Sequence, residues 1–394
     1  MKYNFDEIVD RNNTWSIKHD FKKEYNKSDD ILPLWVADMD FQSPACVREA
    51  LFQAVKHGVF GYMKADDRYF EALSGWYQRR FGWKLEKEWM ICTPGVVFAI
   101  SAALRTFTKE GDAVIIQPPV YHPFRRAIER NGRTLVENPL IFEDNRYRMD
   151  LKDFEKKVAE HNVKLMILCN PHNPVGRVWT REELKALSEI CLRLHIFVIS
   201  DEIHGDFIWP GQVETPYASI SKEAALNSMT CTAPSKTFNL AGFQTSNIFI
   251  PDEEKRSRLK SSLLDMGQEN INRMGLIACE AAYRDGEEWL EQLTAYLYEN
   301  LALLREFTKT RVPEIHLVEP EGTYLAWLDC RELKMTDDEL NRFFSEEAGV
   351  WLDTGIHSGS EGSGFMRFNL GSPRSVIAEA LDRIEAAWIK RQGK

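Results

Sequence analysis

The chain lacks the cysteine patterns of a disulfide framework or a zinc site. Its 394 residues include seven cysteines, and no two of them form a Cys-x-x-Cys pair. Most of the seven stand among apolar neighbours, as reduced cysteines in a protein core do. The nine histidines form no His-Glu-x-x-His motif and no other zinc-like spacing. We therefore expect free core cysteines and neither a structural nor a catalytic metal.

Long apolar runs and concentrated positive charge are also missing. No uninterrupted apolar segment is long enough to cross a membrane, and Met1–Asp6 contains no signal-peptide core. The formal net charge is −10 and no basic stripe stands out, which argues against a nucleic-acid partner. We expect a cytoplasmic protein that binds neither nucleic acid nor membrane.

The length and the hydrophobic pattern indicate two domains around a large core. The middle of the chain alternates short apolar runs with helical patterns, and the expected strands are 113–117, 134–136, 165–168 and 196–199. The expected helices between them are 124–131, 151–160 and a helix that begins at a capping box of Thr180 and Glu183. This alternation predicts an α/β fold, with a mainly parallel sheet covered by helices on both faces.

After about residue 285 the pattern changes to that of a smaller α+β unit. The expected elements are strands at 324–328, 350–352 and 365–370 and helices at 336–348 and 374–391. We predict a large domain over residues 46–285 and a small domain that combines residues 1–45 with residues 286–394.

Three motifs place a lysine, an aspartate and an asparagine at or near the carboxyl ends of buried-type strands. Lys236 lies in TAPSKTFNLAG, Asp201 in IFVISDEIH and Asn173 in LMILCNPHNPVG. Ligands of open sheets bind beyond such strand ends. An enzyme that uses pyridoxal 5′-phosphate (PLP) needs an amine for the aldehyde, a carboxylate for the pyridine nitrogen and a donor for the phenolic oxygen. The three motifs therefore predict a PLP site.

In content and order these motifs resemble the fold-type I PLP enzymes, the superfamily built around aspartate aminotransferase. The resemblance covers nearly the whole chain. Within that superfamily, LWVADMDF at 34–41, SDEIH at 200–204 and SKTFNLAG at 235–242 are similar to the C–S lyase branch of the bacterial MalY and PatB cystathionine β-lyases. The resemblance implies a homodimer whose active sites are shared between the subunits.

The resemblance assigns the chemistry to a few side chains. Lys236 would bind the aldehyde of PLP and later remove the Cα proton of the substrate, which requires a lowered pKa. Tyr121 would stack on the pyridine ring, and its hydroxyl would assist proton transfer near the leaving group. Arg367 would hold the α-carboxylate of the substrate bidentately, next to Asn173 and Tyr121.

The resemblance also implies the contacts that hold the cofactor. Asp201 would pair with the pyridine nitrogen, Asn173 would bind the phenolic oxygen, and His204 would stand beside them. The phosphate would be held at the start of a helix, and its expected ligands are Gly95, Val96, Val97, Ser235 and, from the neighbouring subunit, Tyr62. Each assignment has a purely structural alternative: a strand-end turn for Asp201 and Asn173, a packed loop aromatic for Tyr121, an ion pair for Arg367 and a core position for Tyr62.

Two positions depart from the aminotransferase pattern in the direction of the C–S lyases. His204 stands where aminotransferases usually carry a tyrosine, and Gln244 stands where many carry an arginine for the phosphate. The resemblance thus implies a lyase that cleaves L-cystathionine and related cysteine S-conjugates to a thiol, pyruvate and ammonia. The alternatives are an aminotransferase for a large or aromatic amino acid and an additional regulatory role through protein binding. The expected wall residues of the pocket are Tyr25, Trp35, Phe60, Trp351 and His357.

Overall fold

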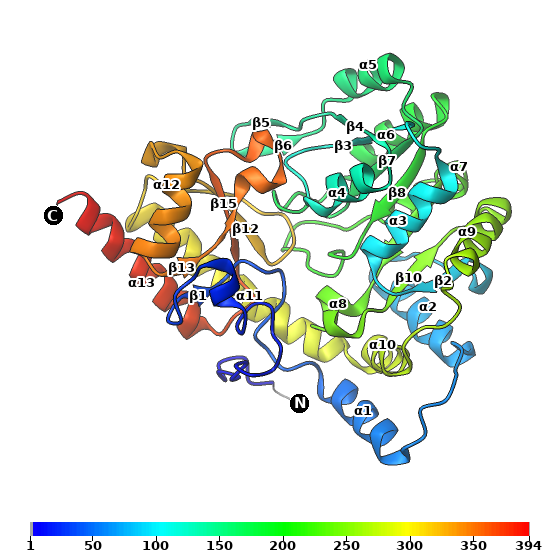
Figure 1. The fold of residues 1–394 in the computed structure, drawn as a ribbon, viewed down its shortest axis with the longest axis horizontal. Coiled ribbons are helices and arrows are strands. Elements are labelled where there is room, and N and C mark those ends of the chain that lie inside the picture. Colours follow the sequence, from blue (N-terminus) through cyan, green and yellow to red (C-terminus); the bar gives the residue numbers. More distant parts are fainter. Residues whose placement is uncertain (1–2, 394) are drawn as a thin grey trace.

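The computed structural model describes residues 3–393 and shows two units, each built around a sheet (Figure 1). A cavity is lined by residues of both units. The larger unit contains a seven-stranded sheet in the order β2-β10-β9-β8-β7-β3-β4. Within this sheet β10 runs antiparallel to both neighbours, and the other adjacent pairs are parallel. The strands are β2 (Met90–Thr93), β3 (Ala113–Ile116), β4 (Thr134–Glu137), β7 (Leu165–Cys169), β8 (Phe197–Asp201), β9 (Ser228–Thr232) and β10 (Ser246–Phe249).

Apolar residues on both faces of the central strands explain why helices cover the sheet twice. Every residue of β3, β7, β8 and β9 is buried, as expected of strands enclosed on both sides. Successive side chains alternate between two core clusters: Val114 and Ile167 belong to one, Ile115 and Met166 to the other. The first cluster contains α3 (Val96–Phe107), α4 (Pro123–Arg130) and α9 (Glu253–Asp265), and the second contains α5 (Leu151–His161), α6 (Arg181–Arg193) and α7 (Lys222–Leu226).

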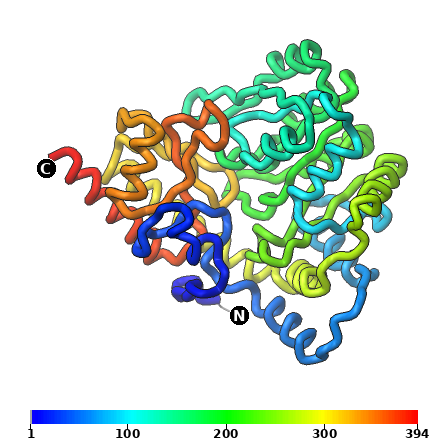
Figure 2. Tube along the Cα trace, viewed as in Figure 1, coloured from blue at the N-terminus to red at the C-terminus, as the bar shows by residue number. Residues whose placement is uncertain are grey.

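Both ends of the chain build the smaller unit. A four-stranded antiparallel sheet combines β11 (His316–Val318), β12 (Leu325–Asp329), β15 (Phe365–Asn369) and β14 (Asp353–Thr354). The helices beside it are α11 (Glu287–Thr310) and α13 (Arg374–Arg391). The N-terminal segment joins through β1 (Leu32–Pro33), which pairs in parallel with β13 (Val350–Trp351). Figure 2 shows the blue N-terminal coil lying against the orange and red C-terminal part.

The structure confirms the predicted α/β class and most of the expected elements. The capping box of Thr180 and Glu183 is formed at the start of α6, and the terminal helix covers 374–391 as expected. The helix expected at 336–348 is α12 (Asp337–Arg342), which continues as a wider π-helical turn through Phe343–Glu347. The boundaries predicted for the two domains stay a prediction, and residues 1, 2 and 394 lie outside the described part.

All seven cysteines are free thiols, and five of them are buried. Across residues 3–393, no helix is both long and apolar enough to span a membrane. The same residues contain no group of three or more histidine, cysteine, aspartate or glutamate side chains that could hold a metal ion.

Candidate active site

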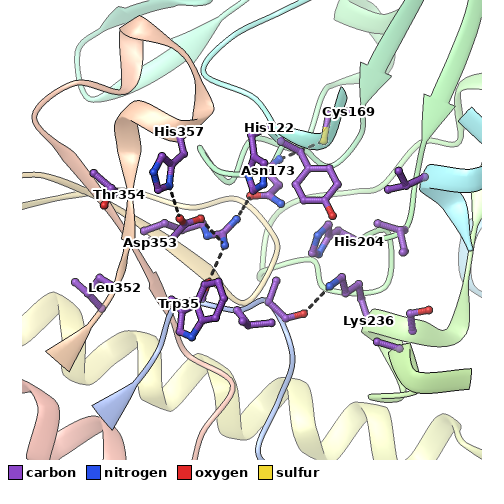
Figure 3. Close-up of a pocket in the computed structure, with 18 of the residues that line it drawn as sticks. Trp35, His122, Cys169, Asn173, His204, Lys236, Leu352, Asp353, Thr354 and His357 are labelled. Atoms are coloured by element: carbon purple, nitrogen blue, oxygen red, sulfur yellow. Dashed lines mark hydrogen bonds and ion pairs between the residues drawn. The ribbon is translucent and has the colours of Figure 1, made fainter. Parts of the chain in front are cut away.

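A cavity of about 850 Å³ lies beyond the carboxyl ends of β7, β8 and β9, between the two sheets. Residues of the small unit, from β13, β14 and β15, close its other side (Figure 3). With the exception of Tyr62, the predicted site residues all line this cavity: Gly95, Val96, Val97, Tyr121, Asn173, Asp201, His204, Ser235, Lys236 and Arg367.

Lys236 lies in the short helix α8 (Pro234–Thr237), which follows directly after β9. Pro234 suits the first helical position because its missing N–H has no helical partner there. The Nζ of Lys236 donates a hydrogen bond of 2.5 Å to the carbonyl of Ala37. Burial lowers the pKa of Lys236 to about 8; nearby Arg367 lowers it further, while Asp38 and Asp201 oppose the shift. The lowered pKa increases the neutral fraction of this amine near neutral pH, which allows it to act as a nucleophile and as a base.

Asp201 is the last residue of β8 and is only 4% exposed. Its Oδ1 accepts a hydrogen bond of 3.2 Å from the backbone N–H of Ile203. Burial raises the pKa of Asp201 to about 7, although Lys236 favours the charged form. The hydrogen bond from Ile203 and the charge of Lys236 offset only part of the cost of burying this carboxylate. The ionised form is therefore favourable only when a cation lies beside it.

Arg367 lies on β15 and is held by three oxygen atoms. Its Nη1 donates to Asn173 Oδ1 at 3.1 Å, and its Nη2 donates to the carbonyl of Trp35 at 2.8 Å. Nη2 also forms an ion pair of 2.8 Å with Asp353, which in turn pairs with His357 at 3.2 Å (Figure 3). The Nε of Arg367 is buried and has no hydrogen-bond partner within the described part of the chain. The guanidinium therefore retains a donor for an anionic ligand.

The start of α3 offers a site for a phosphate. Gly95 precedes the helix at φ 96°, a conformation that favours glycine. The first amides of a helix have no intrahelical partner and attract anions, and those of Val96 and Val97 are at the cavity. Ser235 and Gln244 line the same region. A phosphate would thus meet backbone amides, a hydroxyl and a side-chain amide.

Tyr121 and His204 are uncharged at neutral pH. Burial raises the pKa of Tyr121 to about 12, so the phenol keeps its proton and can donate it. Burial lowers the pKa of His204 well below its usual range, and Lys236 and Arg367 lower it further. The imidazole packs edge-on against Tyr324 at 5.9 Å, and its Nδ1 lacks a hydrogen-bond partner among residues 3–393.

These residues fit PLP. The cavity combines a partly neutral amine, a buried carboxylate that needs a cation and backbone amides suited to a phosphate. Buried polar atoms are normally satisfied, so the unpaired Arg367 Nε and His204 Nδ1 indicate that a polar ligand belongs here.

The segment 35–41 contacts the site through its backbone, which the sequence did not reveal. The carbonyl of Ala37 accepts from Lys236 and also from the Tyr324 hydroxyl at 2.9 Å. The carbonyl of Trp35 accepts from Arg367. One backbone segment thus positions both the amine of the large unit and the guanidinium of the small unit.

Two asparagines hold this segment from opposite sides. Asn239 lies three residues after Lys236, and its Nδ2 donates to the carbonyls of Met39 and Phe41 at 2.8 and 2.9 Å. Asn369 lies two residues after Arg367, and its Nδ2 donates to the carbonyls of Val36 and Asp38, both at 2.7 Å. In the sequence, only their nearness to Lys236 and Arg367 could have identified these two asparagines as residues of the site. Nothing comparable in the sequence marked Asp353 as a partner of Arg367.

Tyr62 and Phe60 lie away from the cavity of their own chain. Both belong to the extended connection between α1 (Ala45–His57) and α2 (Asp67–Phe81), which projects from the lower edge in Figure 1. Tyr62 is 98% exposed, and both residues line a smaller cavity beside Arg273. The expectation that Phe60 forms a wall of the pocket is therefore wrong within one chain, whereas the other expected wall residues, Tyr25, Trp35, Trp351 and His357, do line it. The role of Tyr62 in a neighbouring subunit stays a prediction.

Comparisons with known proteins agree with this geometry. The aminotransferase class I and II family model matches residues 29–384. The chain is 44% identical over 384 residues to cystathionine beta-lyase PatB of Bacillus subtilis, covering 98% of this chain and 99% of PatB. It is 33% identical over 382 residues to protein MalY of Escherichia coli, covering 96% and 97%. The crystal structure of cystalysin from Treponema denticola, which contains PLP, matches with a TM-score of 0.96 at 37% identity, covering 99% and 100% of the two chains.

Proposed function

Since the chain belongs to the aminotransferase class I and II family and, within it, to the PLP-dependent C–S lyases, we propose that it cleaves L-cystathionine and related cysteine S-conjugates. The products are a thiol (homocysteine from cystathionine), pyruvate and ammonia. The observation that carries the proposal is the meeting of Lys236, Asp201 and Arg367 in one cavity. These are the base, the partner of the ring nitrogen and the carboxylate receptor that the reaction needs.

PLP, when bound, supplies an aldehyde for attachment of an amine and a protonated ring that takes up electron density from Cα. Asp201 keeps that ring protonated, because a buried carboxylate favours a cation beside it. The amides of Val96 and Val97, together with the Ser235 hydroxyl, would hold the phosphate. Tyr121 would provide an aromatic surface for the ring.

Three side chains of the cavity act on the substrate. Arg367 holds the α-carboxylate and so sets the orientation of the Cα–H bond toward Lys236. The neutral amine of Lys236 removes the Cα proton. The electron pair of the Cα–H bond then forms the Cα–Cβ double bond, and the pair of the Cβ–S bond leaves with the sulfur as a thiolate. The phenol of Tyr121 keeps its proton, because burial raises its pKa to about 12, and can donate a hydrogen bond to the thiolate as it forms. The three-carbon fragment that remains is hydrolysed to pyruvate and ammonia.

The test is pyruvate release from L-cystathionine by PLP-loaded protein without added keto acid. We expect steady pyruvate formation with equimolar homocysteine, and loss of turnover in Lys236→Ala because that variant lacks the amine that removes the Cα proton. Undiminished β-elimination by Lys236→Ala would contradict the role of Lys236. If no pyruvate forms, and the cofactor is slowly converted to pyridoxamine phosphate in a way that a keto acid reverses, the protein is an aminotransferase. His204 and Gln244, at the two departures from the aminotransferase pattern, line the cavity and favour the lyase.

A homodimer accounts for the position of Tyr62. Exposed apolar side chains gather on α1 and on its connection to α2, and they are Phe52, Val55, Val59, Phe60 and Tyr62. Such a patch is typical of a protein interface. We propose that this surface packs against a second copy and brings Tyr62 to the phosphate of the neighbouring site. The cytoplasmic location and an additional regulatory partner stay predictions.

A further inference from the structure

The outer part of the active-site cavity is lined by aromatic and charged side chains that have no role in the elimination reaction itself. Lys236 and Arg367, which is 7% exposed, line the inner end of the cavity, and Tyr25, which is 42% exposed, lines the same cavity together with Lys27 and Trp351. We call the part lined by Tyr25, Lys27 and Trp351 the outer lining. The α-amino acid part of a substrate is bound at the inner end. The S-substituent, which becomes the leaving thiol, must therefore extend along the outer lining.

An aromatic wall connects the inner end of the cavity to Lys27. The carbonyl of Trp35 accepts from Arg367 Nη2 at 2.8 Å, and its indole stacks on Trp351 with ring centroids 4.3 Å apart and an interplanar angle of 15°. Tyr25 packs against both indoles, at 5.2 and 5.3 Å. The ammonium of Lys27 lies 5.8 Å from the centre of the Trp351 ring. Aliphatic carbons of a thioether would have apolar contact along this wall.

Lys27 differs from Lys22 and Lys23 because its ammonium has neither an ion pair nor a hydrogen bond within residues 3–393. Lys23 pairs with Asp29 at 3.3 Å, and Lys22 donates to the carbonyl of Asp29 at 2.8 Å. The ammonium of Lys27 forms no ion pair and no hydrogen bond with any residue between 3 and 393. Burial lowers its pKa, which Glu346 only partly offsets. A half-buried ammonium without a paired anion favours the binding of an anionic group of a ligand.

We propose that Lys27 binds a carboxylate at the far end of the S-substituent, so that the enzyme prefers cysteine thioethers with an acidic tail. The homocysteine half of cystathionine has such a carboxylate. Its ammonium has polar groups available in Asp338 and Asn341, which also line the outer cavity. The inference rests on the proposed C–S lyase activity and specifies which thioethers that activity favours.

The test compares two cysteine thioethers with tails of nearly equal length, S-(3-carboxypropyl)-L-cysteine and S-butyl-L-cysteine, beside L-cystathionine. The measured quantity is the ratio of kcat/KM for the acidic thioether to kcat/KM for the neutral one. We expect Lys27→Gln to lower this ratio about tenfold, as loss of a charge-assisted hydrogen bond would. The change should lie mainly in KM, because the contact is made equally before and during the reaction.

Two further variants separate recognition of the carboxylate from a structural role of the lysine. Lys27→Arg should keep most of the preference, because a guanidinium also binds carboxylates. Lys23→Gln, an exposed lysine of the same segment, should leave the ratio unchanged. An unchanged ratio in Lys27→Gln, or an equal loss on both thioethers, overturns the inference. Wild-type protein that releases pyruvate from none of the three compounds would instead overturn the proposed lyase activity.

Discussion

Asp201 and Lys236 show how burial prepares single side chains for chemistry. Desolvation disfavours the charged form of each, so the pKa of the carboxyl rises to about 7 and that of the amine falls to about 8. The amine thereby becomes an effective base. The carboxylate becomes a strong partner for any cation placed beside it, which is what a protonated pyridine ring is.

Replacement of Asp201 by asparagine should stabilise the apoprotein and impair the enzyme. The folded pKa of about 7 lies above the ordinary value of 3.8, so the folded chain binds this proton more tightly than the unfolded chain. Ionisation of Asp201 therefore costs stability as the pH rises from about 4 to about 7, by on the order of 4 kcal/mol. Asp201→Asn lacks this cost, yet its kcat should fall about 10²–10³-fold because the ring loses its charged partner.

Urea unfolding of both apoproteins between pH 5 and pH 8, followed by steady-state kinetics, measures these effects. The stability difference between Asp201→Asn and wild type should widen with increasing pH. The PLP-loaded wild-type protein is the control, since a bound cation removes most of the cost. If the free energies of unfolding of the two apoproteins change in parallel with pH, the ionisation of Asp201 carries no cost in the folded protein.

The segment 35–41 acts as a structural link between the two sheets. Its carbonyl groups accept hydrogen bonds from Asn239 and Lys236 after β9 and from Arg367 and Asn369 on β15. The N-terminal part of the chain therefore does more than cover the small unit. It fixes the distance between the base and the carboxylate receptor.

Replacement of Asn369 by alanine should damage both stability and activity. The change leaves the carbonyls of Val36 and Asp38 without their 2.7 Å hydrogen bonds, at a cost of about 1–3 kcal/mol. The Ala37 carbonyl lies between these two groups, so a shift of the segment misplaces Lys236. We expect kcat/KM for L-cystathionine to fall about tenfold to a hundredfold.

Asn300→Ala is the matched control. Asn300 is also buried, and its Nδ2 donates to two carbonyls, those of Leu370 and Ser372, at 3.1 and 2.9 Å. Asn300→Ala should lower the free energy of unfolding in urea about as much as Asn369→Ala does. It should retain more activity, because none of the side-chain hydrogen bonds of Asn300 is made to the segment 35–41. Equal losses of activity in the two variants would refute the linking role of the segment.

At the scale of the whole molecule, the proposal of a site shared between two subunits rests on the exposed apolar surface of α1 and its connection to α2. Every cofactor contact predicted within one chain lies in its own cavity, whereas Tyr62 is outside it. A second subunit is the simplest source of that residue.

Mixed dimers test the shared site. Lys236→Ala should be inactive, and Tyr62→Ala should bind PLP weakly and turn over slowly. If each site combines Lys236 of one subunit with Tyr62 of the other, mixing the two variants under conditions of subunit exchange creates one intact site per heterodimer. Pyruvate release should then exceed that of either variant alone. If the mixed dimers form but release no more pyruvate than either variant alone, Tyr62 does not contribute to the active site of the other subunit.

Most of the fold and most of the site were predictable because the signals are local. Apolar runs identified β3, β7 and β8, and the capping box of Thr180 and Glu183 marked the start of α6. The chain order of the motifs around Asn173, Asp201 and Lys236 identified the site. The position of Phe60, which does not line the cavity of its own chain, was not predictable, because an isolated aromatic residue carries no information on whether its segment folds inward or projects.

The sequence by itself determined which residues stand at the ends of the strands, and hence the cofactor, whereas the class of reaction followed from the resemblance of three motifs to the C–S lyases. Strand ends and helix starts depend on neighbouring residues, so a linear reading reaches them. Only the tertiary structure decided what those residues contact. The carbonyl of Ala37 on Lys236, Asp353 on Arg367 and the aromatic wall beside Lys27 join segments far apart in the chain. Such contacts arise from the packing of two sheets against each other, and no local pattern encodes them.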